Sequence, residues 1–293
     1  MRKLSQLVAL VVLVSFAWTQ TTGKIRGTVS SSDGQALVGA NVIVDGILDI
    51  EGKDYIDTGY TEWGASGLAA VWAENNTRES IYEAFRRKET FATSGSRIKV
   101  RFFGGYNLEK ILEEGDPIKY AYANASSMGS DILQNQNQVP EFMVWAIRDL
   151  KRAPLDRVQI IKGWTELSGK PHEKVYDVAC SDGRKANIKT GLCKDSRAKV
   201  NLSNCKISKN FGADELKVVW KDPDFNPNLK AFYYVRVLEN PTCRWSTWDA
   251  IKSGEKPRGD LPSTIQERAW TSPIWYVPDN DGIEVRNILP DDV

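Results

Sequence analysis

Short stretches with a period of two dominate the chain after residue 95, where apolar and polar residues alternate as in β-strands that bury one face. Seven of them are separated by turn-forming residues: RIKVRFF, FMVWAIR, RVQIIKGW, KVYDVAC, ELKVVW, AFYYVRVLE and SPIWYVP. This number and spacing predict an antiparallel β-sandwich. Residues 106–140 interrupt the series. Because they are rich in Asn, Gln, Ser and Gly, we interpret them as a surface excursion with a short helix over 108–114.

A helical period precedes these strands. Residues 77–88 have apolar side chains three and four positions apart, which predicts an amphipathic helix. The stripe expected to be buried consists of Ile81, Ala84 and Phe85. Asn76 is in position to cap the N-terminus, and Glu79 is the reciprocal acceptor of a capping box. The helix is expected to end in the small-residue turn ATSG at 92–95.

The first 23 residues have the three parts of an export signal. Arg2 and Lys3 form a positive end, residues 7–18 an apolar run, and residues 19–23 a polar exit. A run of about 12 apolar residues is too short to cross a bilayer, which takes roughly 20. We therefore expect a periplasmic or secreted bacterial protein with no transmembrane span after cleavage. An uncleaved anchor is the alternative.

Residues 24–47 form a compact β-rich pattern, with an alternating KIRGTV, a turn signal at Asp33-Gly34 and a second run, GANVIVDG. This pattern resembles the first hairpin of a carboxypeptidase regulatory-like domain of the TonB-dependent receptor type. The further strands of such a domain do not follow. Residues 48–62 have no sustained period, and we interpret them as a linker or junction. A natural fusion and a recombined gene both explain the change of pattern there.

From residue 63 to residue 278 the chain resembles the carboxy-terminal part of the exported bacterial family known as domain of unknown function 3604. The segments that carry the resemblance are SGLAAVWAENNTRESIYEAFRRKETFATSG, IKVRFFGGY, LDRVQIIKGW, HEKVYDVAC, AFYYVRVLENPTCRWSTWDA and IQERAWTSPIWY. The family is related to metallohydrolases of the polymerase-and-histidinol-phosphatase (PHP) type. The resemblance implies that residues 63–95 end a PHP-like α/β domain and that residues 96–293 form the β-sandwich. The expected fold class is therefore α+β, mostly β.

The same resemblance implies metal-dependent hydrolysis of a phosphate or sulfate ester, with a divalent metal in the intact family. His172 is the only histidine in the sequence, whereas a hydrolytic metal cluster needs several convergent ligands. We therefore expect a truncated member that lacks most metal ligands, holds no cofactor and is inactive alone. Thr93, Ser94 and Arg97, in and after the ATSG turn, are the substrate-contact candidates that the resemblance supplies. No catalytic residue is assigned.

For His172, the segment at 222–228 and the ATSG segment, we favour a structural role over a role in binding or catalysis. His172 lies in a turn before a strand, where a partly exposed turn residue is favoured over a ligand or general base. The segment DPDFNPN at 222–228 has oxygen donors suited to calcium or magnesium, but its prolines and the adjacent strand favour a β-turn. The ATSG segment is favoured as a tight turn between helix and strand.

Composition narrows the class of partner. Thirty-nine basic and 38 acidic residues leave a net charge of +1, which argues against nucleic acid. The ten tryptophans fill β-sheet cores or stack on a sugar. A cluster that would stack on a sugar or bind an anion consists of Arg244, Trp245, Trp248, Asp249 and Arg268. We favour the alternative that these residues fix the sandwich to the helix at 77–88. The competing function is a cell-surface or periplasmic ligand-binding or carbohydrate-binding module without catalysis.

Four cysteines lie in the carboxy-terminal half, without the spacing of a zinc or redox motif. They are Cys180, Cys193, Cys205 and Cys243. In an oxidising compartment an even set predicts two disulfides. Three pairings are open, and we favour the two that join neighbours along the chain, Cys180 with Cys193 and Cys205 with Cys243.

Overall fold

The computed structural model describes residues 46–50, 53–57, 63–135 and 138–279. The predicted signal at 1–23 and nearly all of the predicted hairpin at 24–47 lie outside the described residues. β1 (Gly46–Ile50) and β2 (Lys53–Asp57) pair with each other, so part of the stretch interpreted as a linker is β-structure. The description that follows concerns residues 63–279, which belong to one compact unit.

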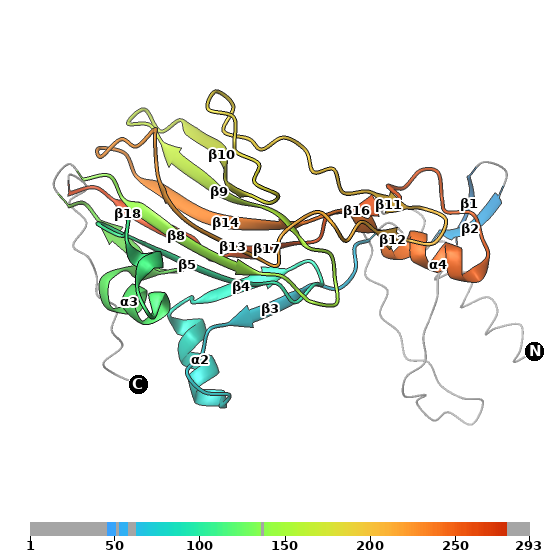
Figure 1. The fold of residues 1–293 in the computed structure, drawn as a ribbon, viewed down its shortest axis with the longest axis horizontal. Coiled ribbons are helices and arrows are strands. Elements are labelled where there is room, and N and C mark those ends of the chain that lie inside the picture. Colours follow the sequence, from blue (N-terminus) through green and yellow to red (C-terminus); the bar gives the residue numbers. More distant parts are fainter. Residues whose placement is uncertain (1–45, 51–52, 58–62, 136–137, 280–293) are drawn as a thin grey trace, which may run out of the picture. The chain divides into compact units, whose positions relative to one another are not determined.

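Two β-sheets make up most of this unit (Figure 1). The larger has eight strands, in the order β10 (Pro171–Cys180), β9 (Leu155–Thr165), β14 (Ala231–Glu239), β17 (Arg268–Thr271), β4 (Thr90–Thr93) and β3 (Leu68–Val71), with β18 (Ile274–Val277) beside β14 and β7 (Asp131–Leu133) beside β18. The smaller has the order β13 (Glu215–Lys221), β8 (Glu141–Ile147), β5 (Lys99–Gly105) and β6 (Ser126–Ser127). Every pairing in the two sheets is antiparallel except that of β7 with β18. The predicted fold, mostly β with antiparallel sheets, is confirmed.

The main core lies between the two sheets because alternate side chains point inward. In β14, Tyr233, Val235 and Val237 are fully buried, while the residues between them are partly exposed. Phe142 of β8 reaches them from the smaller sheet, and its ring centroid lies 4.3 Å from that of Tyr233. Full burial of each such side chain stabilises the fold by roughly 1.5–3 kcal/mol. All seven predicted strands are present, as β5, β8, β9, β10, β13, β14 and β18.

The strands that periodicity does not predict are short. They include β3, β4, β17 and the two-residue pairs β11 (Val200–Asn201) with β12 (Lys206–Ile207) and β15 (Thr242–Cys243) with β16 (Thr264–Ile265). Strands of two to four residues contain too few alternations to be recognised. β4 pairs with both β17 and β3, so residues 68–71 and 90–93 extend the larger sheet.

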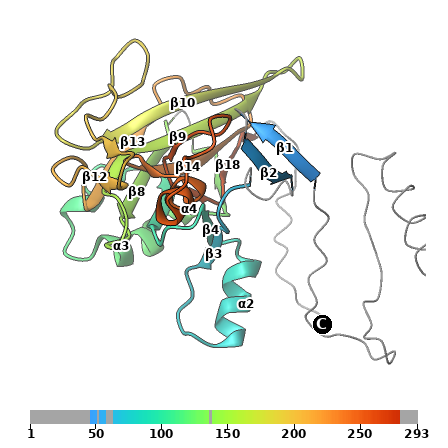
Figure 2. The same ribbon diagram turned by 90° about the vertical axis from the view of Figure 1, so that its right-hand side faces the viewer.

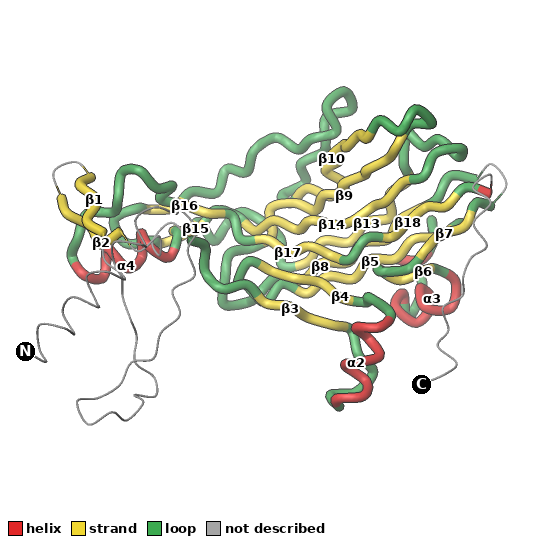
Figure 3. Tube along the Cα trace, turned by 180° about the vertical axis from the view of Figure 1, so that it is seen from behind, coloured by secondary structure: helices red, strands yellow, loops and turns green. Residues whose placement is uncertain are grey.

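Helix α2 (Arg78–Arg86) occupies the predicted position, but its cap and its buried stripe differ from the prediction. Thr77, not Asn76, is the N-cap, and its side-chain oxygen accepts from the backbone N–H of Ser80 at 3.2 Å. Ala84 is fully buried, whereas Phe85 is 50% exposed. The stripe is narrower than predicted because α2 projects from the sheets, as Figures 1 and 2 show. The other long helix, α4 (Trp245–Ser253), lies with β15 and β16 at one end of the sandwich (Figure 3).

The interpretation of residues 106–140 as a surface excursion is wrong. The segment contains the 3₁₀ turn η2 (Ile111–Glu113), helix α3 (Pro117–Asn124), β6 and β7. Its apolar residues build a second core against the smaller sheet, consisting of Phe103, Leu108, Ile111, Ala121 and Met143. These anchors are isolated in a polar sequence, and no period reveals them. The helix predicted at 108–114 is reduced to the single turn η2.

Both predicted disulfides are present, in the favoured pairing. Cys180 is joined to Cys193 and Cys205 to Cys243. The first holds the loop after β10 close to its own strand, and the second ties the β11–β12 segment to β15. Such bonds persist in oxidising compartments, in agreement with the expectation of a protein outside the cytosol.

Candidate ligand-binding face

The outer face of the larger sheet carries aromatic side chains where polar ones are usual. Phe232 and Tyr234 of β14 alternate with the buried Tyr233 and therefore point away from the core. Phe232 lies opposite Trp275 of β18 in the strand register. Trp270, on β17, lies opposite Arg236, which is the outward-pointing residue that follows Tyr234 along β14. We call Phe232, Tyr234, Trp270 and Trp275 the aromatic face.

The path of the chain after β17 brings these residues together. β17 and β18 are consecutive in sequence and pair with successive parts of the same edge of β14. Ser272 and Pro273 separate them, and proline interrupts a sheet ladder because it has no N–H to donate. Both tryptophans therefore flank β14 from one side. They line, with the two β14 aromatics, Thr271 and Pro273, a wide hollow of about 530 Å³.

The rings lie close to one another on the outer face of the sheet. Phe232 and Tyr234 have centroids 6.3 Å apart and planes that differ by 17°. Trp275 stands beside Phe232 at 5.2 Å with a tilt of 54°, and it is 47% exposed. Phe232, Tyr234 and Trp270 are partly exposed. A group of partly exposed aromatic rings marks an interaction site more often than an isolated surface aromatic does.

Gly163 of β9 sets the position of Phe232. The two residues are directly opposite in the register, and a Cβ on Gly163 would lie 2.2 Å from the Phe232 ring. The ring therefore rests on the backbone of the neighbouring strand. Close packing of this kind fixes an aromatic side chain before any ligand arrives.

A polar network continues the same face beyond the rings. Arg236 donates to the side-chain oxygen of Gln159 at 2.6 Å, and Gln159 donates to Asp177 at 2.6 Å. Asp177 also accepts from the backbone N–H of Cys193 at 2.6 Å, so the disulfide-bonded loop packs over this part of the sheet. Gln159 and Asp177 are buried, whereas the aromatic face is open. Burial, followed by the nearby charge of Glu173, raises the pKa of Tyr234, which keeps its hydroxyl protonated.

The tryptophan–arginine cluster predicted from the sequence is divided between two places. Arg244 and Trp245, at the start of α4, both donate to the backbone oxygen of Trp63, at 2.6 and 2.8 Å. Trp248 is 40% exposed on the same helix, where Asp249 follows it. These contacts hold residue 63, and α2 lies apart from α4 in Figures 1 and 3. Arg268 is on β17, with its guanidinium 6.0 Å from the ring of Trp270.

The ATSG segment does not directly follow the helix as predicted, because Ala92 and Thr93 belong to β4 and the turn leads from β4 towards β5. The candidate residues in and after this turn make hydrogen bonds within the protein. Thr93 is buried, and its hydroxyl oxygen accepts from the N–H of Gly95 at 3.2 Å. Ser94 donates to Glu267 and accepts from the backbone N–H of Arg268 at 2.8 Å. The backbone N–H of Arg97 donates to Asp149 at 3.0 Å.

Glu239, the last residue of β14, is a buried acid that sequence reasoning missed. Its side chain is fully buried, and neither carboxylate oxygen makes a hydrogen bond of good geometry within the described part of the chain. Burial raises its pKa to about 8, and the charge of Glu267 acts in the same direction. The partly exposed residues of β14 have even numbers, and the residues between them point inward. Because Glu239 has an odd number, the alternation predicts that its side chain points inward.

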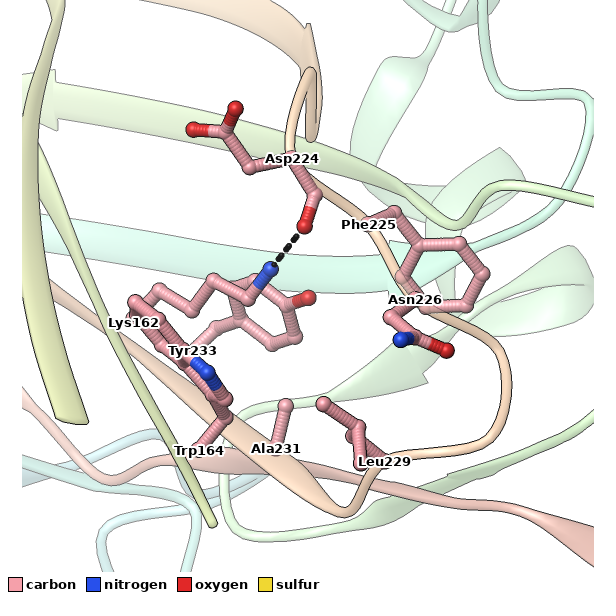
Figure 4. Close-up of a pocket in the computed structure, with 8 residues that line it drawn as sticks. All are labelled: Lys162, Trp164, Asp224, Phe225, Asn226, Leu229, Ala231 and Tyr233. Atoms are coloured by element: carbon pink, nitrogen blue, oxygen red, sulfur yellow. Dashed lines mark hydrogen bonds between the residues drawn. The ribbon is translucent and has the colours of Figure 1, made fainter. Parts of the chain in front are cut away.

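His172 lies in strand β10 opposite Trp164, not in the turn predicted before that strand. Part of the 222–228 segment lines a second and smaller cavity. The His172 ring stacks on Trp164 at 5.1 Å, and its Nε2 lies 2.6 Å from Glu166. The cavity beside Trp164 has a volume of about 190 Å³ (Figure 4). Asp222 and Asp224 do form a turn there, and the buried Lys162 contacts both, as described below.

Two searches of the described residues found nothing. No group of three or more His, Cys, Asp and Glu side chains is arranged there to hold a metal ion. None of the helices in those ranges combines the length and the apolar character that a membrane span requires.

One comparison with known proteins matches. The model of a family described as "Protein of unknown function (DUF3604)" covers residues 21–278. The match includes the aromatic face, the cavity beside Trp164 and the segment expected to be a hairpin at 24–47. No curated protein and no solved structure matches the chain.

Proposed function

The chain belongs to the DUF3604 family, and on that premise we propose that it is an exported β-sandwich that binds carbohydrate on its aromatic face. The observation that carries the proposal is the gathering of Phe232, Tyr234, Trp270 and Trp275 on an open sheet face. These are not the residues that the sequence pattern favoured for this role, apart from the neighbouring Arg268.

The chemistry of a sugar fits such a surface. One face of a pyranose ring presents C–H groups with a partial positive charge, and the face of an aromatic ring carries a partial negative charge. Stacking also releases water from both apolar surfaces. The rings of Phe232 and Tyr234 are nearly parallel, and the ring of Trp275 is tilted beside Phe232, so a flat ligand would contact neighbouring aromatic rings.

Polar groups at the margins of the aromatic face suit the hydroxyl groups of a sugar. Glu173 lies near Tyr234 on one side, and Arg268 lies near Trp270 on the other. Both signs of charge are thus available as donors and acceptors, and this favours a neutral polysaccharide over a polyanion. A protein partner would instead be expected to bury about 800 Å² of surface on each side.

Calorimetric titration with soluble polysaccharides tests the proposal. The panel is laminarin, cello-oligosaccharides, xylan, mannan and pectin, each added to the full chain. We expect at least one to bind and Trp275→Ala to weaken it about tenfold, which corresponds to a loss of roughly 1.4 kcal/mol. Trp248→Ala is the matched control, because this tryptophan is similarly exposed but lies on α4.

Each outcome either assigns the ligand to one of the two sites or refutes the proposal that the protein binds carbohydrate. Binding that is lost in Trp248→Ala and kept in Trp275→Ala would assign the ligand to the α4 cluster. Binding of a protein or of the chain's own first 45 residues, with no polysaccharide bound, would refute the carbohydrate proposal.

Location and ancestry complete the proposal. The two disulfides and the charged, then apolar, amino terminus support a periplasmic or secreted bacterial protein. A relation to PHP-type hydrolases, with ester hydrolysis in the intact family, rests on the resemblance of segments such as ENNTRESIYEAFRRKETFATSG. The regulatory-like hairpin at 24–47 rests likewise on its sequence pattern.

A further inference from the structure

Lys162 and Asp222 form an unusually enclosed ion pair between the two sheets. Lys162 lies on β9 of the larger sheet, and Asp222 directly follows β13 of the smaller one. Their side chains are 5% and 0% exposed, and Nζ lies 2.6 Å from Oδ2. Trp164 and Tyr233 border the amine, with ring centroids 5.1 and 5.9 Å from Nζ. An isolated buried pair of this kind stabilises a fold weakly, because both charges lose their hydration.

The two carboxylate oxygens of Asp222 are held differently. Oδ1 accepts from the backbone N–H of Asp224 at 2.9 Å. Oδ2 receives both Nζ of Lys162 at 2.6 Å and the hydroxyl of Tyr233 at 2.7 Å. The amine is itself fixed by a hydrogen bond to the backbone oxygen of Asp224 at 2.7 Å, which Figure 4 shows as a dashed line. One oxygen is thus anchored to the backbone, and the other lies between two proton donors.

We propose that Lys162 and Asp222 form an intramolecular isopeptide bond, which joins Nζ to the carboxyl carbon and covalently links the two sheets. Nζ already lies 2.6 Å from Oδ2 of the carboxyl group with which it would react, and both side chains are almost fully buried. Proximity of this order replaces a collision by a step within one molecule, and it accelerates amide formation accordingly.

The step balances without any other reactant. The ammonium transfers a proton to Oδ2, and the neutral amine adds to the carboxyl carbon. Nζ then loses a second proton, which Tyr233 relays to Oδ2 while Oδ1 remains on the N–H of Asp224. The C–Oδ2 bond breaks, Oδ2 leaves as water, and Oδ1 becomes the amide oxygen. Burial and the charge of Asp222 raise the pKa of Tyr233, so its hydroxyl carries the proton that the relay needs.

The released water has a place to go. The cavity of about 190 Å³ is lined by both Lys162 and Tyr233 (Figure 4). Figure 4 also shows Phe225 and Asn226 on the side of the cavity opposite Trp164. A water molecule occupies about 30 Å³ of liquid, so the cavity accepts it readily.

A neighbouring pair supplies an internal comparison. Lys174 and Asp224 are also in hydrogen-bond contact, in the same turn region, but their side chains are 46% and 49% exposed. Solvent reaches both groups, and Asp224 also accepts from Tyr176. The pKa of Asp224 is lowered, first by its hydrogen bond with Lys174. We expect this exposed pair to remain ionic.

Mass spectrometry of the full chain, after reduction and alkylation of its cysteines, tests the proposal. The expected result is a mass lower by about 18 Da than the sequence requires, and a tryptic species in which the peptides containing residues 162 and 222 are joined. Lys162→Arg should restore the full mass, and Tyr233→Phe should slow the bond's appearance. Lys174→Arg should keep the deficit.

Three results would overturn the proposal. They are a wild-type chain of full mass, a joined pair at residues 174 and 224, and a deficit that persists in Lys162→Arg. The wild-type peptide map alone decides the matter if Lys162→Arg does not fold. The result is independent of sugar binding, because the aromatic face lies on the opposite side of β14.

Discussion

Replacing Glu239 by glutamine should stabilise the protein at neutral and alkaline pH, and not in acid. An acid whose pKa is raised from 4.5 to about 8 by folding holds its proton in the native state after the unfolded chain has lost it. The native state then binds more protons than the unfolded state, so stability falls as the pH rises between these two values. The contribution of the neutral Glu239 carboxyl group to stability is intact below pH 4.5 and is lost as the pH rises towards 8.

The magnitude follows from the same two values. A difference of this size corresponds to roughly 5 kcal/mol above pH 8, about 3 kcal/mol at pH 7 and under about 0.5 kcal/mol at pH 4.5. Because Glu239 is fully buried, solvent screening reduces these figures little. A glutamine has nearly the same shape and carries no charge at any pH.

Urea unfolding of both proteins at several pH values between 4.5 and 9 measures the effect. We expect the stability of Glu239→Gln minus that of the wild type to rise by several kcal/mol across this range and to level off above pH 8. Glu114→Gln is the control, because Glu114 is exposed, and its difference should stay flat. A flat difference for Glu239→Gln as well would refute the argument that burial holds this carboxyl neutral.

Three further predictions test separate parts of the structure. Gly163→Ala should displace the Phe232 ring, because the added Cβ would lie 2.2 Å from it. We expect thermal unfolding to show a loss of stability of about 1–3 kcal/mol. Unchanged stability would contradict the close approach of the ring to Gly163. Thr77→Ala should destabilise the protein by about 1 kcal/mol and lower its melting temperature, because it removes the N-cap of α2, whereas Asn76→Ala should leave the melting temperature unchanged. A lower melting temperature for Asn76→Ala than for Thr77→Ala would identify Asn76 as the cap. Replacing Cys205 and Cys243 by serine should cost roughly 1 kcal/mol more than replacing Cys180 and Cys193, because the closed loop spans 38 rather than 13 residues; equal losses in denaturant unfolding would count against loop entropy as the cause.

The sheets could be predicted from the sequence because long strands repeat the alternation several times. β14 alternates buried and partly exposed residues from Ala231 to Val237, and its prediction as AFYYVRVLE agrees with its observed bounds. β4 and β17 have four residues each and depend on their neighbours for their conformation. Their pairing joins residues about 180 positions apart, which no local pattern reports.

The candidate site was harder to predict than the fold, for a related reason. Alternation identified β14 as a strand but did not distinguish its two faces, because both carry aromatic residues. Phe232 and Tyr234 were not among the candidates, because aromatic residues are common in strands without any binding role. The cluster in CRWSTWDA drew attention because its residues are adjacent in sequence, yet Arg244 and Trp245 serve to hold Trp63. Residues on one sheet face are two apart or on other strands, and only the register brings them together.

The strict alternation of β14 also separates the two proposals in space. Phe232 and Tyr234 point out to the aromatic face, while Tyr233, between them, points in to Asp222. Consecutive side chains of a strand lie on opposite faces of the sheet, so the backbone stands between a sugar stacked on Phe232 and the amine of Lys162. A covalent link beneath β14 would also stiffen the strand that supports the aromatic face. Tyr233→Phe should therefore leave the enthalpy of sugar binding nearly unchanged, because the outer contacts are untouched, while it slows the loss of water. A large change in both the enthalpy of sugar binding and the rate of water loss would show that the two faces are coupled through the strand.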